Sequence, residues 1–110
     1  DLQQLARLPQ ATVSATATQA RNGDEMVVTV QLKNSGTDVA LQNKLTLVNA
    51  STGKRILPAY YSDNYVSLLP GEAETVTIAY PASAAQGEAP GLTLRAFNLA
   101  QRNIEVGAGR

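Results

Sequence analysis

The run from residue 26 to residue 33 alternates between apolar and polar side chains, and this alternation restricts the fold more than any other feature of the sequence. Four aliphatic side chains recur at every second position, at Met26, Val28, Val30 and Leu32. A period of two places them on one face of a β-strand, because successive strand residues point to opposite sides. The intervening positions are mostly polar, so the pattern predicts a strand with one face in a core and the other toward water.

Several other segments repeat this alternation, with turn-forming residues between them. They lie at residues 12–18, 39–48, 75–80, 92–97 and 104–106. Asn22-Gly23-Asp24 and Pro70-Gly71-Glu72 are turn sequences. About seven short strands with such turns and no long helix are typical of an immunoglobulin-like antiparallel β-sandwich, so we predict an all-β fold of this kind. The expected core comprises Met26, Val28, Val30, Leu45, Leu47, Val76 and Ile78.

The segment 39–48 contains one irregularity. Leu41, Leu45 and Leu47 are expected on its buried face, and Asn43 interrupts that face. An inserted residue in one strand would restore a continuous apolar face on either side of such an interruption. We therefore expect a β-bulge near Asn43.

The connection that follows is small and polar from Ala50 to Arg55, with a glycine near its centre, and it predicts a hairpin-type turn. It leads into Ile56 and Leu57, which we expect to form an edge strand. Pro58 would end the pairing there, because proline has no backbone N–H to donate. Later in the chain, residues 82–85 predict no more than a short helical turn.

Residues 1–9 precede the alternating pattern. They contain three leucines at helical spacing, Leu2, Leu5 and Leu8. Pro9 then disfavours helix at the residue before it. We expect residues 1–9 to be an interdomain connector, either a plain linker or an apolar contact with a neighbouring domain. Residues 10–110 are expected to form the sandwich domain.

Length and charge limit the number of domains and the kinds of partner. At 110 residues, the chain has the size of one domain. Nine basic residues, nine acidic residues and no histidine give a formal net charge of zero. The chain therefore lacks the electrostatic attraction that binding to nucleic acid or to an anionic membrane surface requires. No stretch approaches the ~20 consecutive apolar residues of a membrane span. We expect neither nucleic acid nor a membrane as a partner.

The absence of cysteine and histidine excludes several kinds of site. Without histidine, the chain cannot form a Ser-His-Asp triad or a histidine-ligated metal centre. Without cysteine, it has no disulfide, no thiolate nucleophile and no thiolate metal site. We therefore expect no metal and no cofactor.

Three motifs carry a resemblance to a known family. One loop reads Leu57-Pro58-Ala59-Tyr60-Tyr61-Ser62-Asp63-Asn64-Tyr65, the next turn reads Leu68-Leu69-Pro70-Gly71-Glu72, and an earlier strand ends in Leu32-Lys33-Asn34-Ser35-Gly36. Their order and spacing resemble the immunoglobulin-like domain near the C-terminus of glycoside hydrolase family 2 enzymes, especially exo-β-D-glucosaminidases and endo-β-mannosidases. The last strand of that family often ends in Gly-Trp-Asn, whereas this chain has Ala96-Phe97-Asn98.

The resemblance implies a non-catalytic accessory domain of a larger family 2 glycosidase, in carbohydrate metabolism. The parent enzyme would act on chitosan-like or mannosidic substrates, and this domain would pack on its catalytic domain and support it. The chain by itself would not be an enzyme. A secreted or periplasmic parent fits the resemblance, although the residues themselves do not identify a compartment.

The acidic residues fit this implication. Five of them lie in or beside expected turns: Asp24, Glu25, Asp38, Glu72 and Glu88. A retaining glycosidase needs two carboxyl groups ~5 Å apart at the scissile bond. Turn positions place carboxylates in water rather than in a deep cleft, so we expect no catalytic residue in this chain.

The candidate site is the polar, aromatic loop that contains Tyr60, Tyr61, Asp63, Asn64 and Tyr65. In a structural interpretation, Asp63 and Asn64 bond nearby backbone amides and one or more tyrosines close an end of the sandwich. In a second interpretation, the loop docks against the catalytic domain of the parent enzyme. In a third, the domain is a carbohydrate-binding module, and a tyrosine ring stacks on an oligosaccharide. The residues alone leave all three interpretations open.

Overall fold

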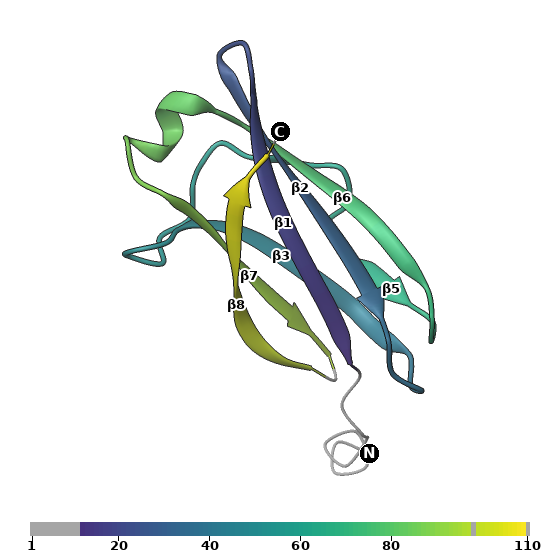
Figure 1. The fold of residues 1–110 in the computed structure, drawn as a ribbon. Coiled ribbons are helices and arrows are strands. Elements are labelled where there is room, and N and C mark those ends of the chain that lie inside the picture. Colours follow the sequence, from purple (N-terminus) through teal and green to yellow (C-terminus); the bar gives the residue numbers. More distant parts are fainter. Residues whose placement is uncertain (1–11, 98, 110) are drawn as a thin grey trace.

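The computed structural model describes residues 12–97 and 99–109. Over these residues, the chain forms eight strands and one short 3₁₀ helix (Figure 1). They are β1 (Val13–Asn22), β2 (Glu25–Asn34), β3 (Ala40–Asn49), β4 (Tyr60–Tyr61), β5 (Val66–Leu68), β6 (Ala73–Pro81), η1 (Ala82–Ala85), β7 (Pro90–Ala96) and β8 (Leu99–Ala108). No helix in this part of the chain is long and apolar enough to cross a membrane. The predicted connector at residues 1–9 lies outside the described residues and stays a prediction.

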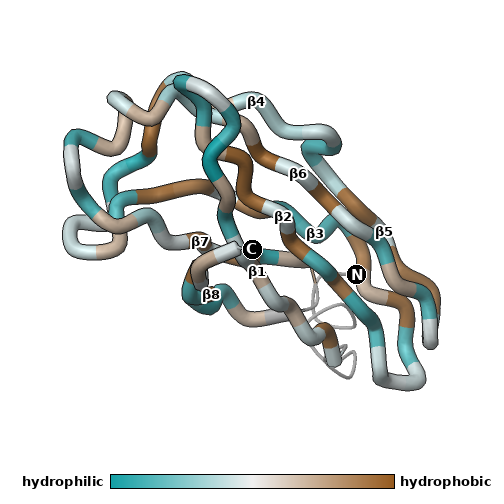
Figure 2. The backbone as a smooth tube through the Cα atoms, turned by 45° about the horizontal axis from the view of Figure 1, so that its top comes forward, coloured by the Kyte–Doolittle hydropathy of each residue, from teal (hydrophilic) through white to brown (hydrophobic). Residues whose placement is uncertain are grey.

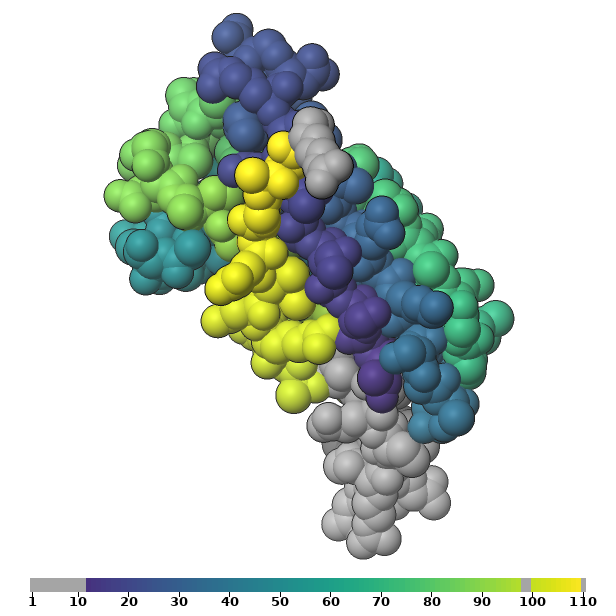
Figure 3. Space-filling model, in the orientation of Figure 1, coloured from purple at the N-terminus to yellow at the C-terminus, as the bar shows by residue number. Residues whose placement is uncertain are grey.

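The strands form one sheet that curls into two facing layers. Their order is β4-β6-β2-β1-β8-β7-β3-β5. All neighbours pair antiparallel except β1 and β8, which run parallel with Ala17 opposite Val106. This parallel pairing joins the first layer (β4, β6, β2 and β1) to the second layer (β8, β7, β3 and β5), and the two strands lie side by side in Figure 3. The predicted all-β sandwich is confirmed.

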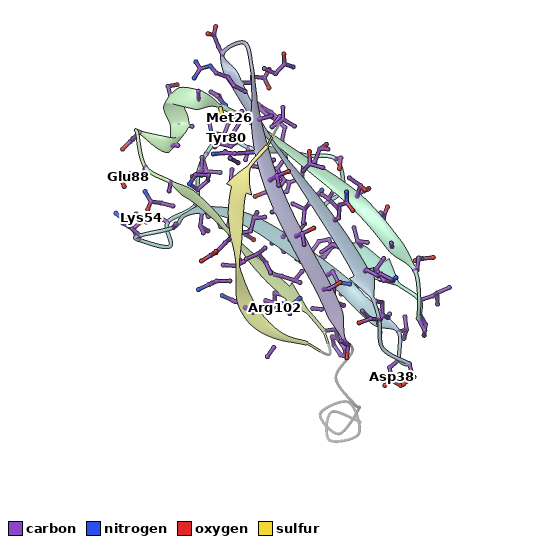
Figure 4. The ribbon with its side chains drawn as sticks, in the orientation of Figure 1. Met26, Asp38, Lys54, Tyr80, Glu88 and Arg102 are labelled. Carbon is purple, nitrogen blue, oxygen red and sulfur yellow. The ribbon has the colours of Figure 1, made fainter. Side chains whose placement is uncertain are left out.

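The core lies between the two layers as a single cluster to which both contribute. Six of the seven predicted core residues are buried: Val28, Val30, Leu45, Leu47, Val76 and Ile78. The seventh, Met26, is partly buried and packs against this cluster, opposite Tyr80 of β6 (Figure 4). Apolar residues accordingly recur along β2 and β6 (Figure 2).

Tyr80 is a structural tyrosine. Its side chain is 1% exposed, and its hydroxyl donates a hydrogen bond to Oε1 of Gln19 on β1 at 2.7 Å. Burial raises the pKa of the Tyr80 hydroxyl above its ordinary value, because the phenolate would lose its hydration. The hydroxyl therefore stays protonated and holds the bond between β6 and β1.

Strand β3 contains the expected bulge, but the bulged residues precede Asn43. The pairing of β3 with β5 shifts between Ala40 and Asn43, and Gln42 has a φ of 51°, in the left-handed region. The extra residue resets the alternation, so Ala40 and Asn43 are both buried. Leu41 is 38% exposed. The prediction that Leu41 lies on the buried face is therefore wrong.

The left-handed conformation of Gln42 predicts that glycine has opposite effects at two strand positions. Gln42→Gly should leave the free energy of unfolding unchanged or raise it by up to about 1 kcal/mol, because glycine adopts this conformation without the steric cost of a Cβ. The matched control, Gln31→Gly at an exposed and regular position of β2, should lower it by about 0.5–1 kcal/mol. Urea unfolding measures both values, and equal losses would contradict the prediction.

Candidate functional site

The predicted loop joins the two free edges of the curled sheet. Strand β4 is the outermost strand of the first layer and pairs with β6, whereas β5 is the outermost strand of the second layer and pairs with β3. The chain leaves β3, adds two residues to the edge of the first layer as β4, and returns to the second layer as β5. Residues 62–65 therefore cross from one layer to the other at the open side of the sandwich.

The entry into this loop differs from the expected edge strand. A single isolated bridge forms, between Arg55 and Val48. Ile56 is buried, and its backbone N–H donates to the carbonyl oxygen of Leu47 at 3.1 Å. Leu57 is 69% exposed. The predicted strand over Ile56 and Leu57 is therefore wrong, because the chain turns away from β3 toward β6 before a ladder can form.

Tyr61 is the tyrosine of this loop that points inward. It pairs with Ile78, which is fully buried, and directly paired residues of an antiparallel ladder lie on the same face. The hydroxyl oxygen of Tyr61 accepts a hydrogen bond from the backbone N–H of Leu47 on β3 at 2.8 Å. This bond connects the edge strand of the first layer to the second layer. Tyr61 thus links the two layers at the open side of the sandwich.

Tyr60 and Tyr65 lie on opposite outer faces of the domain. Tyr60 pairs with Ala79, so it lies on the outer face of the first layer, where it is 67% exposed. Tyr65 lies against the outer face of the second layer, where the Nζ atom of Lys44 is 5.7 Å from the centroid of its ring. With Tyr61 turned inward, the three tyrosines point to three different sides. They form no common aromatic platform, and the carbohydrate-binding alternative is not supported.

Asp63 and Asn64 do not make the backbone hydrogen bonds of the structural interpretation. Both side chains are exposed, and neither makes a hydrogen bond within the described residues. Ser62 takes this role: its N–H donates to the carbonyl oxygen of Thr77 at 2.8 Å, and its Oγ accepts from the N–H of Thr77 at 2.9 Å. The pairing of β4 with β6 explains why Ser62 makes these bonds, because it places Ser62 beside Thr77. Asp63 and Asn64 lie beyond this pairing, in the segment that crosses to the second layer.

The acidic residues do not gather in a cleft. Asp38 and Glu88 lie at opposite ends of the domain (Figure 4), and Asp24 and Glu25 lie at the hairpin between β1 and β2. Five hollows on the surface are each lined by at most one carboxylate. Within residues 12–97 and 99–109, no group of three acidic side chains could hold a metal ion. These hollows therefore do not offer the paired carboxylates that a retaining glycosidase uses.

Asn34 lies outside the predicted site and proves to be a centre of hydrogen bonding. It ends β2 and is fully buried. Its Nδ2 donates to the carbonyl oxygens of Asp38 at 2.7 Å and Leu68 at 3.0 Å. Its Oδ1 accepts from the N–H of Gly36 at 3.0 Å. The side chain thus joins β2 both to the loop that follows it and to β5.

The backbone of Asn34 adds a third connection. Its N–H donates to the carbonyl oxygen of Glu72 at 3.0 Å, and its carbonyl oxygen accepts from the N–H of Gly71 at 2.7 Å. Two of the motifs that carry the family resemblance therefore meet at this residue, although 34 positions separate Asn34 from Leu68. The sequence contains an indication of this role: Asn34 continues the inward face of β2, where a polar side chain needs buried partners.

Removing the Tyr61 hydroxyl should destabilise the domain. Tyr61→Phe keeps the ring but leaves the N–H of Leu47 without its acceptor, and we expect the free energy of unfolding to fall by about 1–3 kcal/mol. Tyr60→Phe is the matched control, because its exposed hydroxyl makes no hydrogen bond within the described residues, and its effect should stay within about 0.5 kcal/mol. Urea unfolding compares the two, and similar losses would refute the role given to Tyr61.

Removing the Asn34 side chain should cost more. Asn34→Ala leaves one buried carbonyl group, one partly buried carbonyl group and one N–H without their partners, so we expect a loss of about 3 kcal/mol or more in the free energy of unfolding. Asn34→Asp keeps the acceptor for Gly36 but loses both donors and buries a charge, so it should not restore stability. The control is Asn103→Ala, at an exposed position of β8. A loss for Asn34→Ala no larger than for this control would show that the hydrogen bonds contribute little.

Comparison with known proteins gives the family. Residues 1–99 match the family described as "Exo-beta-D-glucosaminidase Ig-fold domain". The chain is 36% identical over 107 residues to an exo-β-D-glucosaminidase of Streptomyces avermitilis, in a match that covers 94% of this chain and 12% of that relative. It is 31% identical over 91 residues to a mannosylglycoprotein endo-β-mannosidase of Lilium longiflorum, where the match covers 77% of this chain and 9% of the relative. The chain thus spans a small part of the length of these curated relatives.

The fold gives the same result. The crystal structure of the exo-chitosanase CsxA from Amycolatopsis orientalis matches with a TM-score of 0.86 and 32% identity, over 96% of this chain and 13% of that chain. The predicted immunoglobulin-like sandwich is therefore confirmed. Sequence and fold together establish that this chain belongs to the family of immunoglobulin-fold domains found in exo-β-D-glucosaminidases and related glycoside hydrolase family 2 enzymes.

Proposed function

We propose that this chain is a non-catalytic accessory domain that packs on the catalytic domain of a larger exo-β-D-glucosaminidase-like enzyme and supports it. The proposal rests on one observation: this chain is much shorter than the relatives that it matches. The chain matches almost completely, at 94%, yet it accounts for 12% of the Streptomyces avermitilis enzyme. A hydrolase of that size needs a separate domain for its chemistry, and the remaining domains are available for support.

Three polar side chains in and near the candidate site hold the domain's own fold, which supports this proposal. Tyr61 and Ser62 bond backbone groups, and Tyr80 bonds Gln19 of β1, across the intervening strand β2. A glycosidase would instead present a carboxylate with a raised pKa beside a second carboxylate in a sugar-binding cleft. The surface hollows of this domain are lined by single carboxylates or by none.

Two measurements, one on the isolated chain and one on the full-length protein, test this function. First, the isolated chain should not hydrolyse p-nitrophenyl β-D-glucosaminide, a compound that the related CsxA enzyme binds in one of its structures. Second, deletion of residues 10–110 from the full-length protein should lower the melting temperature of the catalytic domain, because the covered surface becomes exposed to water. Hydrolysis by the isolated chain, or an unchanged melting temperature after the deletion, would overturn the proposal.

A further inference from the structure

We infer that the domain docks through the outer face of β3 and β7, and that the partner surface carries carboxylates and belongs to the catalytic domain of the same polypeptide. This inference rests on the accessory function proposed above. The docking face, which we call the cationic face, consists of Lys44, Tyr65, Arg95 and Phe97. The four residues surround a hollow of about 340 Å³ that Gln42 and Ala96 also line.

The first observation is a pair of like charges. Lys44 on β3 and Arg95 on β7 are direct cross-strand partners, and their neighbours Leu45 and Leu94 are buried, so both cations point outward on the same side. Like charges opposite each other destabilise a sheet. Within the described residues, no carboxylate lies within salt-bridge distance of either cation. Within the described residues, the two cations therefore have no carboxylate as a counter-charge, although the Lys44 ammonium also lies over the Tyr65 ring.

The second observation is the pair of aromatic rings beside these cations. Tyr65 is 59% exposed and Phe97 is 56% exposed. Tyrosine and arginine are enriched in the parts of protein interfaces that contribute most to binding, and exposed aromatic rings beside a hollow are typical of such surfaces. The face combines apolar area with charge, as a protein partner requires.

The third observation is that hydrogen bonds from backbone N–H groups fix the edge of the cationic face. The N–H of Phe97 donates to the carbonyl oxygen of Leu41 at 3.1 Å, and the N–H of Gln42 donates to Oγ of Ser67 at 3.0 Å. The bulge in β3 thus ties Phe97 and β5 to the same strand. A surface that is already ordered loses less entropy on binding.

The central rows of the outer face of the first layer differ in charge and in aromatic content. These rows are neutral and pair like with like, with Thr18 opposite Thr29 and Thr29 opposite Thr77. Such threonine ladders stabilise a sheet that faces water. This is the side seen along β1 and β2 in Figure 3, and it offers neither charge nor aromatic rings along these rows.

The chemistry of the cationic face selects the partner. A glucosamine polymer carries protonated amines and would be repelled by Lys44 and Arg95, so the face is unsuited to a chitosan-like chain. The net charge of zero also provides no long-range attraction for polyanions such as nucleic acid. A carboxylate-bearing surface within the same polypeptide satisfies the cations, and the covalent link makes a small contact area sufficient.

Zero-length crosslinking of the full-length protein with a carbodiimide tests the assignment, because this reagent joins an amine only to a carboxylate in contact with it. Lys44 should couple to an aspartate or glutamate outside residues 1–110, at a yield that does not depend on protein concentration. Lys33, on the outer face of the first layer, and Lys54, at a distant turn (Figure 4), are internal controls that should not couple. A missing Lys44 crosslink, or one that forms only between two copies at high concentration, would overturn the inference.

A charge reversal in the full-length protein provides the second test. The double variant Lys44→Glu, Arg95→Glu should lose the docking contact and melt at least roughly 2 °C below the control double variant Lys33→Glu, Lys54→Glu, which changes net charge equally. Equal melting temperatures would overturn the inference. If deletion of the domain lowers the melting temperature but the charge reversal does not, the accessory function stands and the assignment of the cationic face as the docking surface is wrong. If the deletion has no effect, the accessory function itself fails.

Discussion

A buried amide, the side chain of Asn34, holds the end of the domain where β2, β5 and the turn before β6 meet. Its three side-chain hydrogen bonds all go to backbone groups that are buried or partly buried, and its own backbone adds two more. An unsatisfied polar group inside a protein costs about 1–3 kcal/mol, so these bonds are worth most when all of them form together. The edge strand β5 contributes only three residues to its ladder, so its position relative to β2 depends on this amide more than on pairing.

The curled sheet has two free edges, and the loop between β4 and β5 connects the two strands that form them. A free edge is a template for pairing with another chain, and natural proteins shorten or cover such edges. Here both edge strands are very short, and Tyr61 and Ser62 bind the crossing segment to β3 and β6. The loop that carries the family resemblance is therefore a closing element of the fold. The surface that we propose to face a partner is instead the outer face of β3 and β7, with its charges and rings.

Alternation in the sequence predicted the strands well, because burial of one face is a local requirement that each strand must meet. It failed at Leu41, where an extra residue in β3 reversed the inward and outward faces. Nothing in the sequence indicates the left-handed conformation of Gln42 or the position of the bulge. The hydrogen bonds of the loop were not predictable from the sequence either, because Ser62 bonds β6 while Asp63 and Asn64 lie beyond the pairing of β4 with β6. In both places, the outcome depends on pairing with a strand distant in the sequence, and no local pattern contains that pairing.

The all-β class, the inward faces of the strands and the family follow from the chain's own residues, because side-chain alternation and turn chemistry act over a few positions. The assignment of three neighbouring tyrosines to three different sides does not follow from them. It was decided by the switch of the chain from one layer to the other, since pairing with Ala79 and Ile78 sets which way Tyr60 and Tyr61 point. The juxtaposition of Lys44 with Arg95 likewise exists only once β3 and β7 are in register, because that register depends on the packing of the whole core.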